Sequence, residues 1–297
     1  LSGKQENNGV YFGKEDTLIN RLDEPSWEDI PAQGGTSAKP GLETSAGYVN
    51  ALVSNVDVPV YFGIIPSSAE IWSDRLPEGA PTADEKAIID RLYDTVQTYT
   101  IDVYSALEEH KDEDIYYRTD HHWTSLGAYY GYTALMEAMG MEAEPLNEDA
   151  KVTVTDSFYG TIFSSSGVRW VAPDHIDRYI SGDGLKVTAY FDGTPTDSTL
   201  YVDSYLDKKD KYSSFLGGNQ ALCVIETEHT DAPKVLVIRD SYSDSLAPFL
   251  TQNFSEIHLF DPRMNLNSVK DYVETNEIDQ VVVLYSISNF ISSGEKL

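Results

Sequence analysis

Residues 234–243 read Lys234-Val235-Leu236-Val237-Ile238-Arg239-Asp240-Ser241-Tyr242-Ser243. Apolar, mostly β-branched residues fill positions 235–238, which favours a buried strand. A polar segment follows, and then a predicted helix from about Asp244 to Asn253. Ser241 is therefore expected at the carboxyl end of a strand and close to a helix N-terminus. Backbone N–H groups and the helix dipole favour developing negative charge at such a place.

Two more strand-like runs follow, at 257–260 and 280–285, with a predicted helix between them at 268–276. Strands that alternate with helices imply right-handed βαβ units and a parallel sheet. In such sheets, ligands bind beyond the carboxyl ends of the strands. The loops that follow the three strands are therefore expected to lie together on one rim.

The N-terminal half contains elements of the same kind. The composition of 24–45 indicates a loop, and apolar residues at 48–53 indicate a helix. A buried strand is predicted at 58–65, with Pro59 at its start, where a missing N–H group is tolerated. A longer helix is predicted at 125–139.

Another helix is predicted near Asp84. Thr82 and Glu85 have the spacing of a capping box. The apolar stripe of this helix would comprise Ile88, Leu92, Val96 and Tyr99.

The length of 297 residues fits one large α/β domain over 1–297. Short alternating segments at about 152–230 predict a β-rich insertion within that domain. The lone cysteine, Cys223, lies in an apolar run and is interpreted as a buried strand residue. A single cysteine cannot form an internal disulfide or a Cys-x-x-Cys metal motif.

The formal net charge is −28, from 21 basic and 49 acidic side chains. This balance argues against nucleic acid as a partner, because phosphate binding needs clustered Lys and Arg. It argues equally against peripheral binding to an anionic membrane. The chain shows no signal peptide or transmembrane run. Because it begins at Leu1 without Met, we interpret it as a form that lacks its natural N-terminus. The missing part could include a signal or an anchor, which this sequence does not show.

A second motif reads Thr119-Asp120-His121-His122-Trp123-Thr124. A serine needs a base to take its proton, and a histidine titrates in the useful range. A carboxylate must then orient the imidazole and stabilise its charged form. The spacing of Asp120 and His122 can bring the carboxylate to the ring, but it does not show that His122 reaches Ser241.

Simpler interpretations of both motifs remain open at this point. Ser241 and its neighbours could merely cap the helix that follows. His121 could be a neighbour without a chemical role, and Trp123 a packing or positioning group. Asp120, His121 and His122 could instead belong to a metal site. No further cluster at a recognised spacing completes a coordination shell, so we predict no metal.

With both motifs in view, the sequence resembles the DHHW family. These are bacterial surface proteins related to alginate O-acetyltransferases of the AlgJ/AlgX type, within the wider SGNH/GDSL hydrolase group. The likeness covers nearly the whole chain, and residues 117–124 carry its defining motif. The resembling stretches also include Val10-Tyr11-Phe12-Gly13-Lys14, residues 61–77, Phe158-Tyr159-Gly160-Thr161, residues 215–219 and residues 239–243.

The resemblance implies an SGNH-hydrolase-like three-layer α/β/α fold with a mostly parallel sheet. Asp120 and His122 precede Ser241 here, whereas ordinary SGNH hydrolases place the serine first. This order resembles that of the alginate acetyltransferase type, whose catalytic motifs are circularly permuted. By this resemblance Ser241, His122 and Asp120 form a catalytic triad.

The chain departs from the group's pattern at several positions. Arg239 stands where the usual motif has Gly before Asp-Ser. The oxyanion-hole residues have no secure match: backbone N–H groups around Ser241 and Tyr242 are candidates, and Asn289 and Asn219 are rival side-chain donors. Arg263 is expected near the rim, where it could bind an anionic or carbonyl group or simply pair with an acid.

The resemblance implies serine-dependent acyl transfer, most often O-acetylation of a cell-surface polysaccharide. An acetylesterase with the same triad is the first alternative, and a non-catalytic glycan-binding module on a hydrolase-like fold is the second. We expect no cofactor, because the acetyl group would come from a small ester or from a partner such as a membrane-bound acyltransferase. We also expect an extracytoplasmic, cell-surface location, with anchoring by an N-terminal segment outside this sequence.

Overall fold

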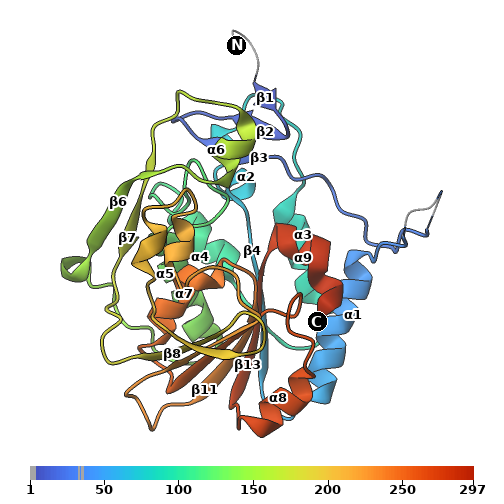
Figure 1. Ribbon diagram of the computed structural model, residues 1–297. Coiled ribbons are helices and arrows are strands. Elements are labelled where there is room, and N and C mark those ends of the chain that lie inside the picture. The colour runs from blue at the N-terminus through green and yellow to red at the C-terminus, as the bar shows by residue number, and fades with distance from the viewer. Residues whose placement is uncertain (1–4, 33, 35–36) are drawn as a thin grey trace.

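The computed structural model describes residues 5–32, 34 and 37–297, with an eight-stranded sheet at its centre (Figure 1). Residues 1–4, on which the N-terminal interpretation rests, lie outside the described part. The strands of this sheet are β4 (Val60–Ile65), β5 (Tyr99–Ile101), β8 (Lys186–Tyr190), β9 (Pro195–Ser198), β10 (Leu222–Glu226), β11 (Lys234–Arg239), β12 (Glu256–Phe260) and β13 (Gln280–Ser286). Their order is β5-β4-β13-β11-β12-β10-β8-β9. The first five pair in parallel and the last three are added antiparallel, so the predicted mostly parallel sheet is confirmed.

Helices cover both faces of the sheet, which gives the three layers that were predicted (Figure 1). One face carries α4 (Val103–Glu109), α5 (Ser125–Ala138) and α7 (Ser243–Leu250), and the other carries α1 (Leu42–Asn55), α3 (Glu85–Thr95), α8 (Val269–Thr275) and α9 (Ile287–Ser293).

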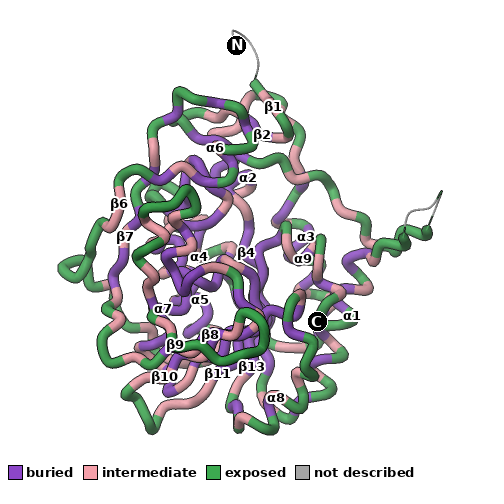
Figure 2. The backbone as a smooth tube through the Cα atoms, viewed as in Figure 1, coloured by how far each residue is buried: buried purple, intermediate pink, exposed green. Residues whose placement is uncertain are grey.

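Strand β11 shows why these layers form. Val235 and Val237 pack with the first group of helices, and Leu236 and Ile238 pack with the second. Successive side chains of a strand point to opposite faces, so an apolar run of this kind is buried on both sides. In Figure 2 the strands at this centre are largely purple, the colour of buried residues.

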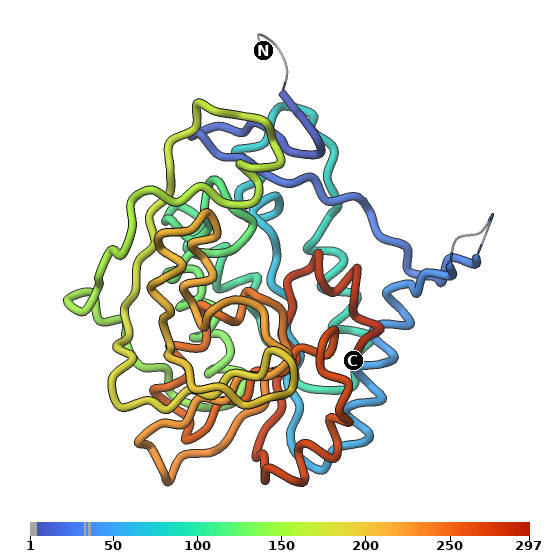
Figure 3. Tube along the Cα trace, in the orientation of Figure 1, coloured from blue at the N-terminus to red at the C-terminus, as the bar shows by residue number. Residues whose placement is uncertain are grey.

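A small cap lies above the carboxyl ends of the parallel strands. It combines a sheet of β1 (Glu6–Asn7), β2 (Val10–Phe12) and β3 (Leu18–Asn20) with two short helices, α2 (Ser68–Ile71) and α6 (Thr161–Ser166). Figure 3 shows the blue N-terminal segment beside the yellow-green segment that carries α6. Val10 and Leu18 pack there against Ile162 in an apolar cluster of their own.

The predicted β-rich middle is divided between two sheets. Strands β6 (Val152–Phe158) and β7 (Asp174–Arg178) pair with each other, whereas β8, β9 and β10 extend the central sheet. Cys223 lies buried on β10, as predicted. The interpretation of 152–230 as an insertion within a single domain stays a prediction.

Two local predictions were wrong around α3. Asp84, not Thr82, caps this helix, because its carboxylate accepts the N–H of Ala87. Glu85 does not close a capping box; its buried carboxyl group bonds to Ser67. The helix also ends at Thr95, so Tyr99 belongs to β5, where its exposed ring stacks on that of Tyr61.

The remaining boundaries differ by a few residues. Helix α1 begins at Leu42, inside the segment predicted as a loop, and α7 ends at Leu250, before the predicted end. Strand β4 follows Pro59 as expected. Thr124 caps α5, and Gly140 follows its end in the left-handed region at φ 66°.

Candidate active site

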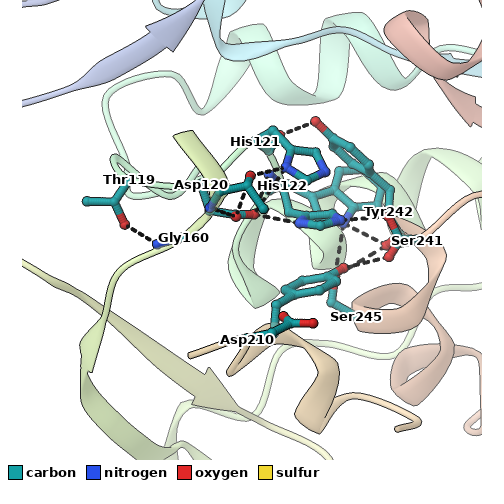
Figure 4. A network of polar contacts seen from close by, with 12 residues as sticks. Thr119, Asp120, His121, His122, Gly160, Asp210, Ser241, Tyr242 and Ser245 are labelled. Carbon is teal, nitrogen blue, oxygen red and sulfur yellow. Dashed lines mark hydrogen bonds and ion pairs between the residues drawn. The ribbon is translucent and has the colours of Figure 1, made fainter. Parts of the chain in front are cut away.

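Two segments far apart in the chain meet at the rim of the sheet (Figure 4). Ser241 follows β11, and the loop 119–124 brings His122 to it. The Ser241 hydroxyl lies 2.7 Å from Nε2 of His122. Nδ1 of His122 lies 2.6 Å from Oδ1 of Asp120. The predicted triad therefore forms one hydrogen-bonded line, from the serine nucleophile through the histidine base to the orienting carboxylate.

Asp120 is buried and held on both of its oxygens. Besides the imidazole, the backbone N–H of His122 donates to Oδ1 at 3.1 Å. The backbone N–H and hydroxyl of Thr161 donate to Oδ2 at 2.8 and 3.0 Å. Burial alone would raise the pKa of Asp120, but the two neighbouring imidazoles and these hydrogen bonds outweigh it and hold that pKa well below its usual range. The carboxyl group is therefore ionised at neutral pH, as an orienting group must be.

Gly160 explains how Thr161 can come so close to Asp120. A Cβ atom at position 160 would lie 2.2 Å from the Cβ of Asp120, far inside van der Waals contact. Only glycine lets the β6–α6 connection approach at this distance. The resembling stretch 158–161 thus has a physical role, although the sequence alone did not assign one to Thr161.

Trp123 is buried and contacts the loop that carries Ser241 through its indole N–H. Its indole N–H lies 3.0 Å from the carbonyl of Tyr242 and 3.0 Å from the hydroxyl of Ser245. A Cβ atom on Gly131 would lie 2.5 Å from the indole ring, so α5 leaves room for it only with glycine there. The positioning role considered for Trp123 agrees with these contacts.

Tyr212 is a site residue that the sequence did not reveal. Its ring stacks on the imidazole of His122, and its hydroxyl donates to the carbonyl of Ser241 at 2.8 Å. The hydroxyl also lies 3.1 Å from that of Ser245. Tyr212 therefore touches the base and the serine loop at once. It is one of 20 tyrosines, and it begins a three-residue 3₁₀ helix, Tyr212–Ser214, whose sequence gives no local signal.

The candidate oxyanion donors have other partners in this structure. The backbone N–H of Tyr242 donates to Oδ1 of Asp240, and the Asn289 amide donates to Oδ2 of the same residue. The N–H and hydroxyl of Ser286 bond to that Oδ2 as well. The buried carboxylate of Asp240 thus joins the end of β11 to the start of α9 by hydrogen bonds. The Tyr242 N–H and the Asn289 amide have the same acceptor here, and their roles as oxyanion donors stay predictions.

The backbone N–H of Ser241 itself has no hydrogen-bond partner among the described residues. It remains a candidate oxyanion donor. The rival Asn219 is exposed in the turn after Gly217 and Gly218, and no contact among the described residues joins it to the triad.

Arg263 lies at the rim but pairs with an acid. Its guanidinium forms a two-pronged contact with Asp261, at 2.9 Å from Nε and 2.6 Å from Nη2. Hydrogen bonds to this carboxylate raise the pKa of Arg263 against the effect of its partial burial. Of the two alternatives for Arg263, the structure contains the ion pair with an acid.

Arg239, the departure from the usual Gly-Asp-Ser, is fully buried behind the serine. Its Nη1 lies 2.9 Å from Oδ1 of Asp244, which is also buried. Burial raises the pKa of Asp244 to about 7, and the Arg239 charge opposes that rise only in part. The pair anchors the first turn of α7 beneath the reacting group.

His121 lies beside the triad without joining its line. Its Nδ1 is 2.7 Å from the hydroxyl of Thr161, and its ring centroid is 3.9 Å from that of His122. Partial burial and the charge of His122 lower the pKa of His121 to about 4, against the opposing effect of Asp120.

Within the described residues, Asp120, His121 and His122 are also the one group whose ligand atoms lie close enough for a metal ion, within 4.8 Å of one another. Both nitrogens of His122 already face protein groups, Asp120 on one side and Ser241 on the other. A metal ion could bind His122 only by breaking its hydrogen bond to Ser241 or to Asp120.

The chain was also compared with known proteins. A search of the curated proteins found no match. Among solved structures, a DHHW family protein from Eubacterium siraeum is 25% identical, with a TM-score of 0.83 over 100% of this chain and 96% of that chain. PatB1 from Bacillus cereus is 20% identical, with a TM-score of 0.72 over 97% of this chain and 98% of that chain. The O-acetyltransferase domain of AlgJ from Pseudomonas putida is 16% identical, with a TM-score of 0.55 over 96% and 92% of the two chains.

The similarities to PatB1 and to the AlgJ domain concern the fold alone. The sequence itself carries the stronger result, because the pattern of the DHHW proteins matches residues 45–260, which is well over half of its length. The chain therefore belongs to the DHHW family.

Proposed function

We propose that this protein is a serine-dependent O-acetyltransferase that modifies a cell-surface polysaccharide. The observation that carries the proposal is the continuous hydrogen-bonded line from Ser241 through His122 to Asp120. A serine beside an imidazole that is itself held by an ionised carboxylate is equipped for nucleophilic acyl transfer.

The reaction proceeds in two halves. Ser241 Oγ attacks the carbonyl carbon of an acetyl donor while His122 Nε2 takes the serine proton. The donor's leaving group then departs with that proton, and an acetyl ester of Ser241 remains. In the second half, His122 takes the proton of a sugar hydroxyl whose oxygen attacks the ester, and then returns that proton to Ser241 Oγ. The Ser241 N–H is the backbone donor best placed to stabilise the oxyanion, and one such donor is typically worth about 3 kcal/mol.

The related structures support this chemistry at the level of the fold. The AlgJ domain is named as an O-acetyltransferase. One structure of PatB1 carries a sulfonyl adduct, and such groups form when an electrophilic sulfonyl reagent meets a nucleophilic atom. We infer a polysaccharide acceptor and, as acetyl donor, a small ester or a membrane-bound acyltransferase. We also infer that the order Asp120, His122, Ser241 reflects a permuted arrangement of the SGNH motifs.

An extracytoplasmic, cell-surface location follows from this acceptor. In the part of the chain that the structure describes, no helix is both long and apolar enough to pass through a bilayer.

An acetylesterase would use the same triad, and the two activities differ in whether water or sugar takes the acetyl group. The test is p-nitrophenyl acetate turnover by the wild type, Ser241→Ala and His122→Ala, with and without oligosaccharide acceptors. Acetylated oligosaccharide that both variants fail to make supports the transferase. Acetate release with every acceptor would identify an esterase. Glycan binding without any turnover would point to the non-catalytic module.

A further inference from the structure

A small cavity lies directly beside the triad and has no part in the reaction described so far. Its volume is about 170 Å³. His121 and Tyr242 line it on the side of the triad, because their ring centroids lie 3.9 and 5.0 Å from that of His122. Other lining residues follow the carboxyl ends of β4 and β13, the edge where α/β sheets bind ligands.

The lining contains hydrogen-bonding groups that the protein leaves unused. Ser68 is only 7% exposed, yet its hydroxyl has no partner among the described residues. Among the described residues, its oxygen is not one of the fully enclosed polar atoms that lack a partner, so a ligand in the cavity can reach it. Oδ1 of Asn289 is also without a partner in the described chain, because only its amide nitrogen bonds to Asp240.

His121 contributes a third free group, and its neighbours assign the tautomer. The Thr161 hydroxyl donates its single proton to Asp120, so Nδ1 of His121 is the donor in its contact with Thr161. The other ring nitrogen, Nε2, then carries a lone pair, since the lowered pKa keeps the ring neutral at pH 7. Nε2 has no partner among the described residues and is available to accept a hydroxyl proton.

Apart from Arg21, the rest of the lining is neutral or apolar. Leu22 and Ile162 offer C–H surface, and the one charged side chain, Arg21, is already paired with Asp23 and Glu6. An anionic ligand would find no uncommitted cation there. The cavity therefore combines free hydrogen-bonding groups with apolar surface. A neutral sugar ring has the matching properties, because its edges carry hydroxyl groups and its faces are apolar.

We infer that this cavity binds one neutral pyranose ring of the acceptor, with its hydroxyls on Ser68, Asn289 and His121. The inference rests on the proposed function and names the acceptor class. The volume lies below the range typical of drug-sized ligand sites, so it suits a single ring and not a long segment of chain. A hydroxyl of the bound sugar gives its proton to His122 Nε2, and its oxygen bonds to the acetyl carbon. The bond from that carbon to Ser241 Oγ breaks, and Oγ regains the proton from His122.

The first test measures binding without any turnover. Ser241→Ala protein is titrated with neutral methyl glycopyranosides of the gluco, galacto, manno and N-acetylglucosamine series, and with methyl glucuronide, by saturation-transfer NMR. At least one neutral glycoside is expected to bind. Adding Ser68→Ala should weaken that binding by about tenfold, the equivalent of one lost hydrogen bond. Ser68→Leu, which fills the cavity, should abolish it.

A matched control is Ser54→Leu, which makes the same change on the exposed surface of α1. It should leave binding of the neutral glycoside intact. The inference is overturned if no neutral glycoside binds, if only the glucuronide binds, or if Ser68→Leu binds as well as Ser54→Leu.

The second test uses the active enzyme and separates this inference from the proposed function. The ratio of acetyl transfer to ester hydrolysis should fall by about tenfold in Ser68→Ala, because the acceptor and not the donor loses a contact. An unchanged ratio would overturn the acceptor site. Loss of ester hydrolysis in Ser241→Ala concerns the proposed function alone. If the wild type hydrolyses no ester at all, the proposed function is refuted. The binding test still decides whether the cavity binds a sugar.

Discussion

The ring of Tyr212 lies flat against the imidazole of His122, with centroids 3.7 Å apart and planes inclined by 9°. The same tyrosine donates a hydrogen bond to the carbonyl of Ser241. The face of an aromatic ring is electron-rich and favours a cation beside it. Tyr212 is therefore placed to hold the base in line and to stabilise the imidazolium that forms when Ser241 gives up its proton.

Two variants separate these roles of Tyr212. Tyr212→Phe keeps the stacked ring and loses the hydroxyl, so kcat/KM for p-nitrophenyl acetate should fall only a few-fold. Tyr212→Leu loses the ring as well, and its kcat/KM should fall by about tenfold more. Equal losses in both variants would contradict a role for the stacked ring.

Asp120→Asn removes the carboxylate that orients His122. The kcat for ester hydrolysis should fall by about 10³–10⁴-fold, because an amide does not hold the Nδ1–H tautomer or stabilise the imidazolium. The control is Asp210→Asn, a nearby carboxylate that bonds to Ser213 and not to His122 (Figure 4). A comparable loss in both variants would show that net charge, and not orientation, accounts for the effect.

Gly160→Ala tests the close approach of the β6–α6 connection. The added methyl group meets Asp120 at 2.2 Å, so the carboxylate must move and turnover should fall strongly. Gly47→Ala is the matched control, because a Cβ atom there meets nothing within 4 Å. It lies within α1, so it should leave turnover unchanged and stabilise the fold by about 1 kcal/mol. Wild-type turnover in Gly160→Ala would contradict the role given to this contact.

Glu85 gives the fold a specific dependence on pH. Burial raises its pKa to about 7, although two hydrogen bonds from Ser67 oppose the rise. A glutamate in the unfolded chain has a pKa of about 4.3, so between about pH 4 and 7 the folded state holds a proton that the unfolded state has lost. Stability therefore falls as pH rises through this window and levels off above it.

Glu85→Gln should remove this part of the pH dependence. The loss of unfolding free energy between pH 5 and pH 8 should shrink by about 2 kcal/mol, as measured by urea denaturation. Asp244, whose pKa is also raised to about 7, should keep a second part of the slope in the variant. Identical slopes in the wild type and Glu85→Gln would refute the assignment.

Removal of metal distinguishes the triad from a metal centre. Both His122 nitrogens serve Asp120 and Ser241, so dialysis against EDTA should leave ester hydrolysis unchanged. Loss of activity that zinc restores would instead favour the Asp120, His121 and His122 group as ligands.

Sequence reasoning succeeded where the signal is local. The apolar run 235–238 placed Ser241 at a strand end, because burial on both faces leaves a continuous apolar pattern. The contact between His122 and Ser241 spans 119 positions, and no spacing rule encodes it. The resemblance to a family joined the two motifs before the geometry did.

The misses have the same physical origin. Tyr212 reaches the site from a 3₁₀ helix of only three residues, so neither periodicity nor a motif marks it. The bond from the Asn289 amide to Asp240 could not be foreseen either, because it forms only after β11 and β13 are side by side. The bond from the Tyr242 N–H to Asp240 is local, since an Asp side chain often accepts the N–H two residues on. Gly160 in the stretch 158–161 was the one available clue to Thr161, since glycine often marks a close approach.

The most direct test of the central claim is to locate the acetyl group on the enzyme. The protein is mixed with p-nitrophenyl acetate, quenched in acid within the first turnover and mapped by peptide mass spectrometry. One acetyl group on Ser241 of the wild type, absent from Ser241→Ala and formed far more slowly in His122→Ala, is the predicted result. Acetylation at another residue, or turnover with Ser241 never modified, would contradict the account.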